Sequence, residues 1–135
     1  MQAEAKRPYL MGTGVIGLTL PLHPFLPFDL SVQIAALLLA LIAGAYIGFG
    51  AADGRVNVFF GELAGAGMFG GAALLGLIWQ PWVIAVGIFA HAFWDFLHLN
   101  DNFGARIPKW YIPFCAWIDI AVGIGLLVIW YVIQR

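Results

Sequence analysis

Residues 31 to 50 contain no charged side chain, and this run constrains the fold more than any other feature of the chain. A helix that crosses the hydrocarbon core of a membrane needs about 20 mainly apolar residues. Of all 135 residues, 63% are hydrophobic and 10% are charged, whereas soluble domains have about 45–50% and about 25%. The chain therefore has too little polar surface for a soluble globular protein, and we predict an all-α membrane helix bundle.

Three more apolar runs follow the first and are separated by short polar or proline-containing segments. They cover residues 56–79, 82–99 and 110–133. Because proline cannot continue a helix interior, Pro81 separates the second span from the third. The N-terminal run, residues 9–22, is short for a full span at about 1.5 Å per residue. We expect a single domain, residues 1–135, with four full spans and a short irregular N-terminal membrane segment, which makes five segments.

The six basic residues predict how the chain is oriented in the membrane. If the N-terminal segment crosses, five of them lie on one side and only Arg135 on the other; otherwise the split is three against three. Basic residues concentrate on the cytoplasmic side. We therefore expect an inner-membrane protein whose N-terminus and 100–109 loop are cytoplasmic. With seven acids balancing these six bases, the chain has no basic patch for nucleic acid.

Ionisable side chains inside the expected spans mark the candidate site. These are the acids Glu62, Asp95 and Asp119 and the histidines His91 and His98, and no Lys or Arg lies within the same spans. Ionisable groups cost about 2.5–3.5 kcal/mol each to insert and usually mark a functional site. Protons or a bound cation must therefore neutralise most of the negative charge.

The spacing of these five residues places them in one layer of the bundle. Asp95 and His98 follow His91 by four and seven residues, so at about 100° per residue the three share an arc of about 60° on one helix face. Counted at about 1.5 Å per residue from the cytoplasmic loops, all five lie within roughly 13 Å of that side. Imidazole and carboxylate groups together are typical of zinc and non-haem iron sites, including those of helical bundles. We predict a site for one or two divalent metal ions, zinc or iron, with the ligands His91, Asp95, His98, Glu62 and Asp119.

A metal-dependent membrane enzyme is the leading functional hypothesis. It would be a hydrolase or oxygenase that acts on a lipid-like or apolar substrate near the cytoplasmic leaflet, with Glu62 and Asp119 as catalytic residues. Two alternatives stay open: a small proton- or cation-coupled carrier, and a non-catalytic subunit or assembly factor whose polar layer holds helices together. Cys115, one turn before Asp119, is expected to be an inert buried thiol. His23, beside prolines at the other end, is expected at the surface.

Glycines four residues apart allow helices to approach closely. The chain has three such pairs, Gly44/Gly48, Gly61/Gly65 and Gly67/Gly71. We expect them to pack inside the bundle, with a homo-oligomer through these faces as the alternative. The remaining expected partners are membrane lipid and an apolar substrate.

Two segments give the chain a resemblance to a known family. His91-x-x-Trp-Asp-x-x-His98 is followed by Cys115-x-x-x-Asp119, and both come after AYIGFG at 45–50 and GEL at 61–63. Over roughly residues 40 to 120 the chain resembles small bacterial integral membrane proteins of a domain-of-unknown-function family, the 6010 family or a relative. Members carry a second histidine directly after the position of His98, where this chain has Leu99. The resemblance implies a five-segment membrane bundle and supports the grouping of the five site residues, but it implies no activity.

Overall fold

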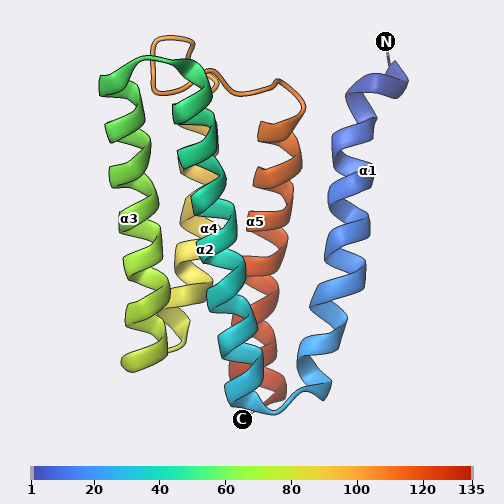
Figure 1. The fold of residues 1–135 in the computed structure, drawn as a ribbon. Helices are drawn as coiled ribbons and strands as arrows, with labels where there is room; N and C mark the ends of the chain where they lie inside the picture. The colour runs from blue at the N-terminus through green and yellow to red at the C-terminus, as the bar shows by residue number, and fades with distance from the viewer. Residues whose placement is uncertain (1, 135) are drawn as a thin grey trace.

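The chain folds into a bundle of α-helices (Figure 1). The computed structural model describes residues 2 to 134, so Arg135, which entered the charge comparison, lies outside the described residues. Between residues 2 and 134 there are five α-helices and no strand. The elements are α1 (Gln2–Thr19), the 3₁₀-helix η1 (Leu20–Phe25), α2 (Phe28–Asp53), α3 (Val56–Ile78), α4 (Trp82–Leu97), α5 (Tyr111–Val128) and the π-helix η2 (Ile129–Ile133).

Glycine and proline set most of the helix boundaries. Pro27 directly precedes α2, and Gly54, with a φ of 87°, ends it in the left-handed conformation that favours glycine. Pro81 directly precedes α4. The helices predicted over the four apolar runs are confirmed, with ends within a few residues of the expected positions.

The N-terminal segment differs from the short irregular segment that its sequence suggested. It forms a regular α-helix of 18 residues, α1, which starts at Gln2 instead of Tyr9. The added turns contain Ala, Glu and Lys, which are strong helix formers. Irregular structure begins only at Leu20, where two prolines in the next five residues keep the chain in a 3₁₀-helix.

Within residues 2 to 134, three helices are long and apolar enough to cross a membrane: α2, α3, and α5 together with η2. The fourth apolar helix, α4, has 16 residues and is therefore about 24 Å long. Large apolar side chains cover the outside of the bundle, as illustrated by Ile78 and Val132, which are 73% and 72% exposed. A surface this apolar is unsuited to water and is compatible with an integral membrane protein.

Helices α2 to α5 run alternately up and down, and α1 lies beside α5 and runs in the same direction (Figure 1). The Trp117 indole of α5 donates a hydrogen bond to Thr13 of α1, with 3.0 Å between Nε1 and Oγ1. The start of α1, the α2–α3 turn and the α4–α5 connection all lie at one end of the bundle (Figure 1). We call this the loop end.

Helices α4 and α5 approach each other closely because α5 has a glycine at the contact. A Cβ added to Gly123 would lie 2.8 Å from the Cβ of Phe89 and 3.0 Å from the backbone oxygen of Ala85. The apolar core lies beside this contact and includes the fully buried Ile88 and Leu126. The close contact brings the polar residues of the two helices opposite each other.

The glycine pairs do not all serve the internal packing that was expected of them. Gly65 does, because a Cβ there would come within 2.4 Å of the Trp94 ring. The other five have no neighbour within 4 Å of an added Cβ: Gly44, Gly48, Gly61, Gly67 and Gly71. The expectation of internal packing therefore holds at Gly65 only.

Candidate metal centre

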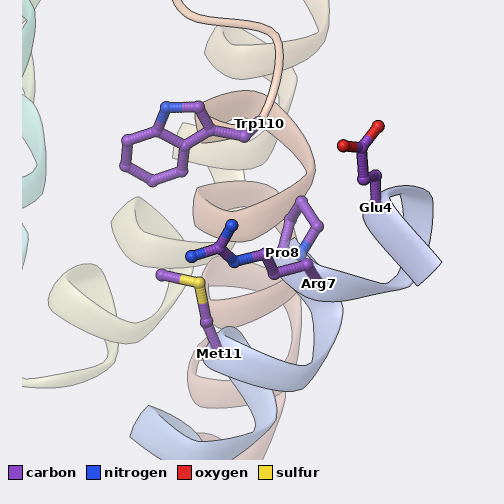
Figure 2. A pocket seen from close by; sticks show the side chains of 5 residues that line it. All are labelled: Glu4, Arg7, Pro8, Met11 and Trp110. Carbon is purple, nitrogen blue, oxygen red and sulfur yellow. The ribbon is translucent and has the colours of Figure 1, made fainter. Parts of the chain in front are cut away.

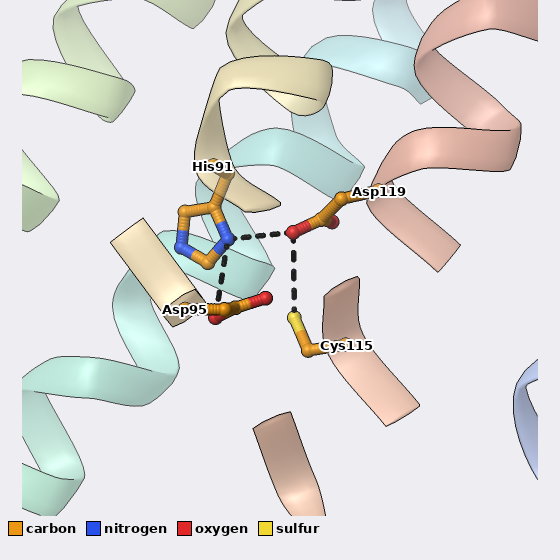
Figure 3. Close-up of side chains that lie close together, drawn as sticks. All are labelled: His91, Asp95, Cys115 and Asp119. Carbon is orange, nitrogen blue, oxygen red and sulfur yellow. Dashed lines mark hydrogen bonds and ion pairs between the residues drawn. The ribbon is translucent and has the colours of Figure 1, made fainter. Parts of the chain in front are cut away.

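Four potential metal ligands meet where α4 faces α5. His91 and Asp95 lie one turn apart on α4, and Cys115 and Asp119 lie one turn apart on α5 (Figure 3). Residues four apart share a helix face, so each helix presents two donors to the other. One ligand atom from each residue lies within 4.8 Å of the others. We call these four residues the buried donor cluster.

The His91 imidazole is the centre of the buried donor cluster. Its Nδ1 lies 2.8 Å from Oδ2 of Asp119 and 3.7 Å from Oδ1 of Asp95. The thiol of Cys115 contacts the same Asp119 oxygen at 3.7 Å (Figure 3). His91, Asp95 and Asp119 are fully buried, and Cys115 is 2% exposed. The cluster therefore lies inside the protein, away from solvent and lipid.

Tyr46 of α2 forms the wall of the cluster toward the loop end. Its hydroxyl donates a hydrogen bond to Oδ1 of Asp95. Its ring lies between two imidazoles, with centroid distances of 5.4 Å to His91 and 4.7 Å to His98. Tyr46 itself is fully buried, so it fixes Asp95 and separates His98 from the cluster.

Glu62 and His98 form a second buried pair, distinct from the buried donor cluster. Oε1 of Glu62 accepts a hydrogen bond from the backbone N–H of Ala105 and lies 2.7 Å from Nε2 of His98. Nδ1 of His98 lies 2.8 Å from the carbonyl oxygen of Trp94. A carbonyl oxygen only accepts hydrogen bonds, so Nδ1 carries a proton. With Nε2 facing a carboxylate, the geometry is that of an imidazolium–carboxylate pair.

The chain between α4 and α5 is fixed onto this pair. Gly104 has a φ of 65°, and a Cβ there would lie 2.5 Å from both Glu62 Oε1 and His98 Nε2. Only glycine can therefore pass so close to the pair without strain. Arg55 donates to the carbonyl oxygen of Gly104, and Asp53 accepts from the backbone N–H of Arg106.

Arg55 and Asp53 also bind each other across the α2–α3 turn. Their side chains form two hydrogen bonds, of 2.6 Å and 2.9 Å. The hydrogen bond to the Asp53 carboxylate raises the pKa of Arg55 above its ordinary value. Arg55 is therefore engaged at the loop end and does not neutralise the acids of the buried donor cluster.

The five residues predicted for the site fall in two groups instead of one. His91, Asp95 and Asp119 lie together, whereas Glu62 and His98 bind each other. Both nitrogens of His98 are engaged, so it offers no lone pair to a metal ion in this conformation. The set of donors that the structure brings together is therefore His91, Asp95, Asp119 and, in addition, Cys115.

Cys115 and Tyr46 belong to the site but were not predicted as site residues. Cys115 had a signal, since it lies four residues before Asp119 and hence on the same helix face. No sequence pattern in α2 pointed to Tyr46, because its hydrogen bond to Asp95 depends on how α2 crosses α4.

Polar atoms without partners concentrate in this layer. In the part of the chain that the structure describes, five buried side-chain polar atoms lack a hydrogen-bond partner, and four belong to the predicted site. They are Glu62 Oε2, His91 Nε2, Asp95 Oδ2 and Asp119 Oδ1. Buried polar groups in proteins are usually paired, and each exception calls for an explanation such as an ion.

The buried donor cluster has the composition of a site for one divalent transition metal ion. Zinc takes four ligands from Cys, His, Asp and Glu at about 2.0–2.3 Å, so tetrahedral donors lie about 3.3–3.8 Å apart. The present donors lie within 4.8 Å of one another and would have to move closer by about 1 Å to hold an ion. One dication would also offset the negative charges of Asp95 and Asp119, since α2 to α5 contain no Lys or Arg.

Three cavities at the loop end do not have the buried donor cluster among their lining residues. A cavity of about 290 Å³ lies between the first turns of α1 and the start of α5, lined by Glu4, Arg7, Pro8, Met11 and Trp110 (Figure 2). Two others flank the second pair at the loop end: one of about 610 Å³ is lined in part by His98, and one of about 260 Å³ in part by Glu62. The Glu62–His98 pair thus lies between these cavities and the protein interior.

Over the described part of the chain, the fold and the site define a class: an all-helical protein with three helices long and apolar enough to cross a membrane and a buried His/Asp/Cys group that could hold a metal ion. No protein-family model, no curated protein and no solved structure matches the chain. The resemblance to the 6010 family therefore stays an expectation.

Proposed function

We propose that the chain is an integral protein of the inner membrane in which α2 to α5 span fully and α1 forms a fifth membrane segment. The loop end would face the cytoplasm. The distribution of charge supports this orientation, because the elements at the loop end carry five basic residues: Lys6, Arg7, Arg55, Arg106 and Lys109.

We further propose that the protein is a metal-dependent enzyme that acts on an apolar, lipid-like substrate at the cytoplasmic leaflet. The buried donor cluster is the observation that carries this proposal. Two carboxylates, one imidazole and one thiol lie within reach of a single ion, without a basic residue in the surrounding spans. The burial of so many uncompensated polar groups is costly, and a bound cation would offset that cost.

Each residue has a distinct part in this proposal. His91, Asp95, Cys115 and Asp119 would hold the ion, and zinc or iron is the metal that such ligands suit. The ion would supply Lewis-acid chemistry for hydrolysis or, if it is iron, oxygen chemistry. Tyr46 holds Asp95 in position through its hydrogen bond. Asp119 retains the unpartnered Oδ1, which makes it the candidate for accepting a proton.

Elemental analysis tests the metal directly. Protein purified from its native membrane should contain about one zinc or iron per chain, and protein stripped with a chelator should regain it on reconstitution. His91→Ala should remove the metal, whereas His23→Ala, a buried histidine outside the site, should retain it. The proposal is overturned if the folded wild-type protein holds no stoichiometric metal and takes up none.

A proton- or cation-coupled carrier is the second candidate. The enclosure of the cluster favours it, because the two cavities beside the Glu62–His98 pair have neither Asp95 nor Asp119 in their linings, and two adjacent carboxylates can titrate during transport. In proteoliposomes, a proton or cation flux should then be lost in Asp95→Asn and Asp119→Asn. A flux that survives both changes excludes the carrier.

A further inference from the structure

Two sides of the buried donor cluster are closed by apolar contacts. Toward the end opposite the loops, α4 and α5 meet at Gly123, where an added Cβ would lie 2.8 Å from the Cβ of Phe89. Toward α3, the ring of Phe69 packs edge-on against the His91 imidazole, with 4.8 Å between the ring centroids. A polar solute would lose its water on either side without gaining a partner. Neither side is therefore a favourable route to the cluster.

The side of the cluster toward the loop end is polar. The Tyr46 hydroxyl binds Asp95 there, and the Tyr46 ring contacts the imidazole of His98 at a centroid distance of 4.7 Å. His98 follows Asp95 by about one turn of α4, and its backbone N–H donates to the Asp95 carbonyl oxygen. Its side chain is bound to Glu62, and both side chains are buried. The Glu62–His98 pair is therefore the polar barrier between the cluster and the cavities that the two residues line in part.

The connection between α4 and α5, residues 99–110, covers this pair and contains neither helix nor strand. The backbone passes directly against the pair at Gly104. Three hydrogen bonds hold it there: from Ala105 to Glu62, from Arg55 to Gly104 and from Arg106 to Asp53. Segments with few and partly exposed hydrogen bonds open locally at a lower free energy than packed helices do. The cover over the pair is therefore the part around the cluster that opens most readily.

Opening of this connection would also relieve an unfavourable feature of the closed state. Oε2 of Glu62 is buried without a hydrogen-bond partner, and leaving a buried acceptor unpaired is unfavourable. Movement of Gly104 and Ala105 away from the pair would admit water to the carboxylate. The hydration of Glu62 would offset part of the loss of its hydrogen bond from Ala105.

We propose that the 99–110 connection is a gate that opens by leaving the Glu62–His98 pair and so admits small hydrophilic solutes to the buried donor cluster from the loop end. A hydrated divalent cation is the solute that the cluster suits, and it passes His98 and Tyr46 on its way in. The inference rests on the proposed function, because it describes how that site is opened and closed. The opening itself does not require an ion.

Cys115 reports the opening of the gate, because it is the one cysteine of the chain and is 2% exposed. The probe is a positively charged, membrane-impermeant methanethiosulfonate, which forms a mixed disulfide with a thiol that it reaches and releases methanesulfinate. The rate of labelling is followed by intact-protein mass spectrometry on the full-length, chelator-treated protein in detergent. When opening and closing are fast relative to labelling, this rate follows the population of the open state.

Two variants should favour the open state without touching the cluster. Gly104→Ala places a methyl group 2.5 Å from both Glu62 Oε1 and His98 Nε2 and should speed labelling at least about tenfold, which corresponds to about 1.4 kcal/mol. Arg55→Ala removes a hydrogen bond to the connection and should speed it at least about threefold. Labelling at the wild-type rate in either folded variant overturns the proposal. If Gly104→Ala does not fold, Arg55→Ala decides, since this side chain is 46% exposed.

Ser31→Ala is the control for a general loosening of the bundle. It removes the shared partner of His23 and Trp130 at the end opposite the loops and leaves the 99–110 connection unchanged. Its labelling rate should equal that of the wild type. If Ser31→Ala speeds labelling as much as Gly104→Ala does, the reagent reaches Cys115 through unfolding or from the other end, and the gate is excluded.

The same variants separate the gate from the proposed metal centre. In protein loaded with metal, Arg55→Ala should transfer the ion to a chelator at least about threefold faster at unchanged affinity, because the closed state still predominates. Stoichiometric metal with wild-type labelling and transfer rates contradicts the gate and leaves the metal centre intact. Faster labelling in a protein that binds no metal supports the gate and contradicts the metal centre.

Discussion

Two buried polar networks, one toward each end of the bundle, differ in how completely their atoms are paired. At the end opposite the loops, the hydroxyl of Ser31 accepts a hydrogen bond from the Trp130 indole at 2.9 Å and lies 2.7 Å from Nδ1 of His23. Toward the loop end, the buried donor cluster and Glu62 contain four polar atoms without a partner. The first network therefore has the character of structural contacts between helices, and the second has the character of a binding site.

The two networks also differ in charge. The Ser31 network consists of neutral groups, because burial lowers the pKa of His23 and keeps its imidazole uncharged at neutral pH. The buried donor cluster instead contains two carboxylates around one imidazole. Neutral paired groups stabilise a fold, whereas buried uncompensated acids destabilise it unless something binds them. Each prediction below tests this contrast.

The largest expected effect is on metal affinity. Asp119→Asn removes a charged ligand and should weaken zinc or iron binding at least about 100-fold, because loss of an outer-shell partner alone costs about 10–100-fold. The measurement is a competition titration with a chromophoric chelator. Asp29→Asn, an exposed acid in the first turn of α2, is the matched control and should bind metal like the wild type. Equal affinity in the two variants would contradict the assignment of Asp119.

The second effect is on the stability of the metal-free protein. Replacing both carboxylates, as in Asp95→Asn/Asp119→Asn, should raise the free energy of unfolding of the chelator-treated protein by about 1–4 kcal/mol, the gain seen when buried ion pairs are replaced by uncharged hydrophobic residues of similar volume. Thermal unfolding in detergent, followed by circular dichroism, measures it. A destabilised double variant would mean that the cluster is structural and that its acids are already compensated.

The third effect is a loss of stability, and it concerns the Ser31 network. Ser31→Ala removes the shared partner of His23 and Trp130 and should lower the free energy of unfolding by about 1–3 kcal/mol, the cost of leaving buried polar groups unpaired. The same unfolding measurement applies, and metal content should not change. If Ser31→Ala were neutral while retaining a native fold, the hydrogen bonds of this network would not contribute to stability.

Much of the fold follows from the sequence because its causes are local. Pro27, Pro81 and Gly54 interrupt the apolar runs, so the helix limits could be predicted closely. His91 and Asp95 were recognised because residues four apart share a helix face. Longer-range causes escaped prediction. Glu62 was assigned to the metal, yet the path of the 99–110 connection places Gly104 and Ala105 against it and pairs it with His98.

His23 illustrates the same limit at the other end. Prolines on both sides indicated an exposed loop, and the prediction that His23 lies at the surface is wrong: it is 4% exposed. Gln134, distant in sequence, donates hydrogen bonds to the carbonyl oxygens of His23 and Leu26 and folds the end of the chain over this loop. Contacts between residues far apart in the sequence leave no local pattern from which burial could be predicted.

The smallest expected effect is a pH dependence of stability that arises in the Ser31 network. Because burial lowers the pKa of His23, the unfolded chain binds a proton there more readily than the folded protein does. Its contribution to stability is therefore present above about pH 6.5 and is lost as the pH falls below that value.

In His23→Gln, the free energy of unfolding should decline less between about pH 7.5 and about pH 5.5 than in the wild type. Ser31→Ala, which keeps the imidazole, should retain the wild-type decline. An identical decline in His23→Gln and the wild type would show that the titration of His23 is not coupled to folding, and the contrast between the two networks would then depend on the unpartnered acids alone.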